Sequence, residues 1–181
     1  MTTATGVGFI EMRISKVVAV GRGENDMLEC IVLDEVHGDR HLVIEVGSPE
    51  AFSLAATLGG TEWRRPMTYQ FMAAVVESVG ARVRQVRIDR VIDGAYAATV
   101  ELEGPAGTGL VDARSSDALN LAALTNATVF AAPEVVDENE HRRAGDEARA
   151  ALLRRAPQLP AMTVRRAEPA EEPWDWVDGP G

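Results

Sequence analysis

The chain has 181 residues, an apolar content of 46% and a formal net charge of −10 at pH 7, which describe a soluble globular protein that can be one domain. No apolar run approaches the ~20 residues of a membrane-spanning helix, and the amino terminus lacks the basic and apolar segments of a signal peptide. We therefore expect a cytoplasmic protein with no membrane partner. The acidic charge disfavours strong binding of nucleic acid, since phosphate contacts need local positive charge.

The first part of the sequence predicts three strands and a helix. The strands are apolar segments, one alternating with polar residues and the others bounded by turns: Ile10–Ser15, Met27–Leu33 and Leu42–Val46. Ser48 is predicted to cap a helix with Pro49 at its first position, and Gly59-Gly60 ends that helix.

The second part repeats this order after a linking helix, which Thr68 is predicted to cap and which runs to Val79. Asp93-Gly94 predicts a tight hairpin between the first two of three further strands, which are Val83–Val91, Ala95–Glu103 and Leu110–Ala113. Ser115 or Ser116 is then expected to cap a helix that ends near Thr125. One more strand is predicted at Thr128–Ala131.

A short internal repeat links the two parts. The stretch Glu45–Ala56 recurs at Asp112–Ala123 without insertion or deletion. Acid matches acid at two positions and several small or apolar residues are identical: Glu45/Asp112, Glu50/Asp117, Ala51/Ala118, Leu54/Leu121, Ala55/Ala122 and Ala56/Ala123. Each copy reads as the end of a strand turning into a capped helix. We predict an α+β fold of two related three-stranded units, each followed by a capped helix, with acidic side chains at two corresponding corners.

The carboxy-terminal part differs in character from the rest. We predict a domain over residues 1–137, a charged helix over 138–156 and a disordered tail, rich in Pro and acid, over 157–181. Trp174 and Trp176 in this tail could form a docking motif for a protein partner.

From about Phe9 to Asp137 the chain resembles the bifunctional nuclease domain family. Val43–Ala56 is similar to the family's strand and Gly-x-x-Glu-Ala helix start, and residues 65–68 match its Arg-Pro-x-Thr. Residues 112–118 resemble its most specific signature, Asp-Ala-Arg-Pro-Ser-Asp-Ala. The resemblance implies an α+β fold and a nuclease of low specificity that acts on RNA and DNA.

The chain departs from the family pattern at two places. The family continues Arg-Pro-x-Thr with His-Asp, whereas this chain has Tyr69-Gln70, and Ser115 replaces the usual Pro. The first departure removes a candidate general base and a candidate metal-binding carboxylate, because Tyr is a poor base at neutral pH and Gln does not ionise. An alternative to the nuclease is therefore a catalytically degenerate interaction or regulatory module on the same scaffold.

Metal-assisted phosphodiester cleavage needs clustered carboxylates for a divalent ion such as Mg²⁺ or Mn²⁺, and a cation for the phosphate charge. The acids available are Glu45, Glu50, Asp112 and Asp117. We predict as catalytic residues Asp112, Asp117, Arg114 and Glu50, and as phosphate contacts Arg65, Arg114 and Thr68. Helix-start stabilisation by Glu50 and Asp117, and an architectural Asp112–Arg114 ion pair, remain open as structural alternatives.

A local basic cluster lies in the second part: Arg82, Arg84, Arg87 and Arg90. Strand alternation is expected to send Arg84 and Arg87 to opposite faces, which favours a solvated edge over a nucleic-acid-binding stripe. Exposed strand edges in such small units can pair, so a homodimer is a further prediction.

Overall fold

A computed structural model of the chain describes residues 8–21 and 27–144. The tail predicted at 157–181, with Trp174 and Trp176, lies outside the described residues. In chain order the elements are β1 (Ile10–Gly21), β2 (Met27–Glu35), β3 (His41–Val46), α1 (Ser48–Leu58), α2 (Thr68–Ser78), β4 (Arg82–Ile92), β5 (Ala95–Gly104), β6 (Gly107–Arg114), α3 (Ser115–Thr125), β7 (Thr128–Ala131) and α4 (Pro133–Ala144).

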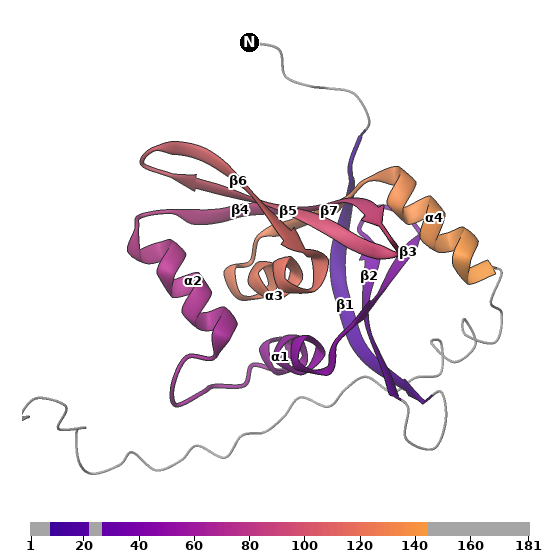
Figure 1. Cartoon of the computed structure of the whole chain (residues 1–181), viewed down its shortest axis with the longest axis horizontal. Coiled ribbons are helices and arrows are strands. Elements are labelled where there is room, and N and C mark those ends of the chain that lie inside the picture. Colours follow the sequence, from indigo (N-terminus) through magenta and orange to yellow (C-terminus); the bar gives the residue numbers. More distant parts are fainter. Residues whose placement is uncertain (1–7, 22–26, 145–181) are drawn as a thin grey trace, which may run out of the picture.

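All seven strands form one sheet in the order β3-β2-β1-β7-β4-β5-β6. The first three strands and the second three each pair in antiparallel fashion, as two related units should. The short strand β7 lies between them, antiparallel to β1 and parallel to β4 (Figure 1). The α+β class is therefore confirmed, and β7 explains how the two units become a single sheet.

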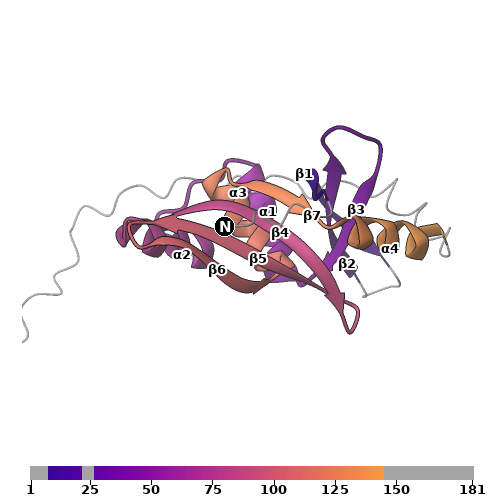
Figure 2. The same cartoon turned by 90° about the horizontal axis from the view of Figure 1, so that it is seen from above.

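The two repeat helices, α1 and α3, pack against each other on the same side of the sheet (Figures 1 and 2). Their identical positions face the core: Ala51 and Ala118 are buried, as are Leu54 and Leu121. Small Ala side chains let the helices and the sheet approach closely, while Leu54 fills the space between them. Truncating a fully buried Leu of this kind to Ala costs about 2–5 kcal/mol.

The hairpin between β4 and β5 has the predicted turn chemistry. Asp93 and Gly94 both have positive φ, 49° and 83°, as a two-residue type I′ turn requires. Gly carries no steric penalty at this φ, and Asp tolerates it better than most residues.

The predicted side-chain caps are wrong by one residue. Ser48, Thr68 and Ser115 are the first helical residues of α1, α2 and α3, and the residues before them make no side-chain cap hydrogen bond. Ser48 instead donates its hydroxyl to Glu29 of β2, at 2.9 Å. The hydroxyl is therefore used to fix the corner against the sheet rather than to cap the helix.

Helix α4 belongs to the folded domain. It begins at Pro133, so the predicted boundary at 137/138 falls inside it, and Val135 and Val136 join the main core. Asn139 is buried and bonds both backbone groups of Val43, accepting from N–H at 3.2 Å and donating to C=O at 2.8 Å. Apolar residues of the first turn thus anchor a helix whose sequence otherwise reads as a charged surface helix.

Helix α2 lies at the opposite end of the molecule from α4 (Figures 1 and 2). Its apolar face only partly meets the core: Val76 packs against it, but Phe71 is 63% exposed and Val79 is 67% exposed. No helix in the described part of the chain is long and apolar enough to span a membrane.

Candidate functional site

The packing of α1 against α3 brings the two repeated corners together. Asn120 of α3 links them, because its buried side-chain amide donates to the backbone carbonyl of Glu50 at 3.1 Å and to that of Ser116 at 3.0 Å. The corresponding residue of the first repeat is Ser53. This cross-link fixes the helix start that carries Glu50 beside the one that carries Asp117.

One arginine binds the carboxylates of both corners. Arg114 donates from Nε and Nη2 to the two oxygens of Asp117, at 2.6 and 2.9 Å, and also from Nη2 to Oε1 of Glu50, at 2.7 Å. The equivalent residue in the first corner is Gly47, where an added Cβ would lie 2.5 Å from Oε2 of Glu50. The glycine therefore leaves the space in which Glu50 lies.

Tyr69 is the fourth member of this cluster. The side chain is mostly buried at the start of α2, and its hydroxyl donates to Oδ1 of Asp117 at 2.6 Å. Burial first, and then the neighbouring Asp117 carboxylate, raise the pKa of Tyr69 well above its usual 10.0. Tyr69 is therefore a proton donor at neutral pH and cannot act as the base.

Asp117 is held in its ionised form. Burial alone would raise its pKa, but the hydrogen bonds from Arg114 and Tyr69 together outweigh burial and keep the pKa below the usual 3.8. Asp117 is thus a carboxylate with a fixed orientation and low basicity.

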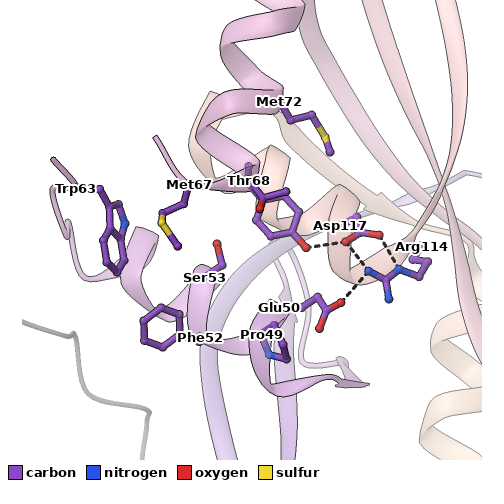
Figure 3. Close-up of a pocket in the computed structure, with 11 residues that line it drawn as sticks. Pro49, Glu50, Phe52, Ser53, Trp63, Met67, Thr68, Met72, Arg114 and Asp117 are labelled. Atoms are coloured by element: carbon purple, nitrogen blue, oxygen red, sulfur yellow. Dashed lines mark hydrogen bonds and ion pairs between the residues drawn. The ribbon is translucent and has the colours of Figure 1, made fainter. Parts of the chain in front are cut away.

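The cluster forms one wall of a pocket with a volume of about 440 Å³. In Figure 3 the charged side chains Glu50, Asp117 and Arg114 lie on one side, while Phe52, Trp63 and Met67 lie on the other. The pocket lining comprises Pro49, Glu50, Phe52, Ser53, Trp63, Met67, Thr68, Tyr69, Met72, Arg114 and Asp117. The Phe52 and Trp63 rings contact each other with centroids 5.9 Å apart. The pocket therefore has a polar wall, formed by Glu50, Asp117 and Arg114, opposite an apolar wall, formed by Phe52, Trp63 and Met67.

Four of the predicted site residues therefore meet in one pocket: Glu50, Asp117, Arg114 and Thr68. The others do not line it. Asp112 on β6 is 84% exposed and lies 4.0 Å from Arg90, so the expected Asp112–Arg114 pair does not form, since Arg114 turns to Glu50 and Asp117 instead. Arg65 is exposed in the segment before α2, and Glu45 lies on β3.

Sequence reasoning missed two parts of this site. From the sequence, Tyr69 is only the replacement of the family's His, although its place directly after Arg-Pro-Met-Thr is the available signal. The next residue, Gln70, stabilises the start of α2, because its Oε1 accepts a hydrogen bond from the backbone N–H of Met67 at 3.1 Å. Trp63 and Phe52 gave no signal, since they come from different segments and follow no motif.

The donor set does not fit a divalent metal ion. A guanidinium already lies between the Glu50 and Asp117 carboxylates, where an ion bridging them would have to sit. Across residues 8–21 and 27–144, no group of three or more His, Cys, Asp or Glu side chains could hold a metal. The positive charge at this site belongs to Arg114.

The basic cluster of β4 does not form a positive stripe. The pairing of β4 with β5 shifts register between Val83 and Gln85, so strict alternation does not hold there, and Arg84 and Gln85 both bond Glu101. Each arginine also has an acidic partner, in the pairs Arg82–Glu103, Arg84–Glu101, Arg87–Asp89 and Arg90–Asp112. The charges of this basic cluster are therefore largely compensated.

These features define an α+β protein with a pocket built from two repeated strand-to-helix corners around one arginine. The chain belongs to the bifunctional nuclease domain family, whose model matches residues 31–143. It is similar to two Mycobacterium tuberculosis proteins, uncharacterized protein MT1877 of strain CDC 1551 / Oshkosh and uncharacterized protein Rv1829 of strain ATCC 25618 / H37Rv. Each is 28% identical over 100 residues, which is 55% of this chain and 59% of the relative. The chain thus spans about three fifths of the length of these curated relatives.

Proposed function

We propose that this chain is a nuclease of low sequence specificity that cleaves RNA or DNA phosphodiester bonds at the Arg114 pocket. The observation that carries the proposal is the fixed guanidinium, which two carboxylates orient while 67% of the side chain stays exposed. Its Nη1 has no hydrogen-bond partner among the described residues, so it can donate to a phosphate oxygen. A preorganised donor of this kind stabilises the charge that develops during phosphoryl transfer.

The other residues divide the remaining tasks. Asp117 is the carboxylate that would accept a proton from an attacking water, and its low basicity predicts slow turnover. Tyr69 holds Asp117 in place as a hydrogen-bond donor. Thr68 and Arg65, at the start of α2 and just before it, would contact the neighbouring phosphate.

The second candidate is a non-catalytic interaction or regulatory module. It is favoured by Tyr69, which replaces the family's His with a group that stays protonated. It is also favoured by the exposed apolar side chains of α2 and by β6, which is at the sheet edge and carries exposed Leu110 and Val111. The predicted homodimer would use such surfaces, and light scattering of the purified protein tests it.

The deciding experiment is a cleavage assay with labelled single- and double-stranded RNA and DNA in Mg²⁺, in Mn²⁺ and in EDTA. The proposal expects cleavage that survives EDTA and falls at least tenfold in Asp117→Asn. Glu103→Gln serves as the matched control, since Glu103 forms an exposed ion pair with Arg82 and neither residue lines the Arg114 pocket. Absence of cleavage in every condition would support the module instead. Strict dependence on Mg²⁺ or Mn²⁺ would restore the metal-assisted scheme.

A further inference from the structure

The apolar wall of the pocket has no role in the chemistry proposed above. Phe52, Met67 and Met72 are each between 37% and 46% exposed, and Trp63 is half-buried beside them. Large apolar side chains gathered at the mouth of a polar site usually mark a binding surface. Because Trp63 contacts Phe52 in a tilted arrangement of 52°, its indole is not fully stacked by that ring.

The size and shape of the pocket restrict its occupant. A volume of about 440 Å³ is within the ~300–1,000 Å³ of small-ligand pockets and is enough for one nucleotide. A base inside a duplex cannot reach such a pocket without leaving the stack. Every base has an apolar face that can stack on an indole or pack against a thioether.

The polar wall can read the edge of a stacked base. Glu50 uses Oε1 for Arg114, and its Oε2 has no hydrogen-bond partner within the described ranges. A carboxylate oxygen accepts from the exocyclic amino groups of adenine, cytosine and guanine. Uracil and thymine carry no such amino group, so they gain less from Glu50.

We infer that this pocket binds one unpaired nucleobase of a single-stranded nucleic acid, stacked on Trp63 with its amino edge at Glu50. The inference deepens the proposed function by naming single-stranded nucleic acid as the substrate class. It rests on the proposed function only in assuming that the bound strand is cleaved at this pocket. Binding of a base can be measured without any turnover.

The charges around the pocket predict how this binding responds to salt. Glu50, Asp117 and Arg114 together carry a net charge of −1, and exposed Arg64 and Arg65 follow Trp63 in the chain. Two phosphate contacts, from Arg114 and Arg65, give a slope of log K against log salt of about −1.4. Stacking, rather than charge, therefore provides most of the affinity.

The test uses the full chain with Trp174→Phe and Trp176→Phe, which leaves Trp63 as the only one of the 3 Trp residues. Oligo(dA), oligo(dC) and oligo(dT) of equal length, and a duplex of that length, all with nuclease-resistant phosphorothioate linkages, are titrated while Trp63 fluorescence is followed. Gels confirm that the oligonucleotides stay intact. We expect saturable quenching by the single strands, in the order dA or dC above dT, and weaker binding of the duplex.

Variants identify the contacts, with anisotropy of end-labelled oligo(dA) as the readout. Trp63→Ala should weaken binding about tenfold or more, while Trp63→Phe keeps a stacking face and most of the affinity. Phe71→Ala is the matched control, because Phe71 is an exposed aromatic residue of α2 outside the pocket lining. Glu50→Gln should remove the preference for dA over dT, with circular dichroism confirming that the variant is folded.

Three results would overturn the inference: equal binding of duplex and single strand, equal effects of Trp63→Ala and Phe71→Ala, or no binding of any oligonucleotide. The inference and the proposed function can fail separately. Binding without cleavage would leave the base site and reject the nuclease. Cleavage that Trp63→Ala does not change would leave the nuclease and reject the base site.

Discussion

The two repeated corners have the same backbone but different chemistry. Each ends a strand and begins a helix, at Ser48 and at Ser115, and each carries an acid at the third helical position. The first has Gly47 where the second has Arg114. If both copies carried Gly, Glu50 and Asp117 would face each other without a cation, and if both carried Arg, Glu50 would be displaced. The difference between Gly47 and Arg114 thus makes the site asymmetric although the two corners have the same order of strand and helix.

Removing the guanidinium breaks this arrangement most completely. Arg114→Gln should lower the cleavage rate about 10²- to 10³-fold, since it removes the donor proposed to stabilise the transition state. The stability loss should be about 1–3 kcal/mol, because the Arg114 side chain is 67% exposed but its partners Glu50 and Asp117 are only 15% and 26% exposed and would lose their cation. Single-turnover kinetics and urea unfolding measure the two effects. If the Arg114→Gln variant is less stable but its folded fraction cleaves at the normal rate, Arg114 takes no part in the chemistry.

The link between the corners can be tested at equivalent positions. Asn120→Ala should destabilise the domain by about 1–3 kcal/mol, since it removes the donor to two backbone carbonyls in a buried site. Ser53→Ala, at the matching position of α1, should change the free energy of unfolding by less than about 0.5 kcal/mol. Chemical denaturation of both variants checks the comparison. Equal losses of unfolding free energy in the two variants would mean that the hydrogen bonds of Asn120 do not hold the two corners together.

The lowered pKa of Asp117 predicts an acid-sensitive contribution to stability. Because the pKa is lower in the folded state than its usual 3.8, the contribution is present above that value and is lost as the pH falls through the folded pKa. Asp117→Asn should therefore flatten the fall in unfolding free energy below about pH 4. Unfolding curves from pH 6 to pH 2 measure it, with Glu103→Gln as the exposed control. A parallel decline in wild type and Asp117→Asn would show that Asp117 is not held as described.

Tyr69 gives the subtlest test, since it joins the second corner to α2. Tyr69→Phe removes the bond to Asp117 and should cost about 0.5–1.5 kcal/mol of stability, with the pocket otherwise intact. Tyr69→His restores the family's residue next to Asp117 and should raise cleavage severalfold, because a histidine can accept a proton near neutral pH. Thermal unfolding and initial rates measure the pair. A fall in rate for Tyr69→His, in a folded variant, would contradict the role given to this position.

The repeat made much of the fold predictable from sequence. Matching Ala and Leu positions indicated two equivalent helices, and their packing brings Glu50 and Asp117 together as the repeat suggested. The partners of Arg114 were not predictable. Asp112 and Arg114 are two residues apart and would share a face within a strand, but β6 ends at Arg114. There Arg114 turns toward α1 and α3, leaving Asp112 at the exposed edge.

Other features depend on contacts that local patterns do not encode. The register shift in β4 places Arg84 beside the same Glu101 that Gln85 binds, which strict alternation excludes. The wall formed by Phe52 and Trp63 comes from a helix and a loop that meet only in the folded chain. The position of β7 between the two units likewise follows from long-range pairing with β1 and β4.

The most direct test compares two arginines in one assay, Arg114→Gln in the pocket and Arg82→Gln, an exposed arginine of β4 that does not line the pocket. Cleavage of single-stranded RNA and DNA is followed for both variants and for the unaltered chain, with and without EDTA. The account predicts that the unaltered chain and Arg82→Gln cleave at the same rate, while Arg114→Gln is at least 100-fold slower. Equal rates for both variants, or no cleavage by the unaltered chain, would contradict it.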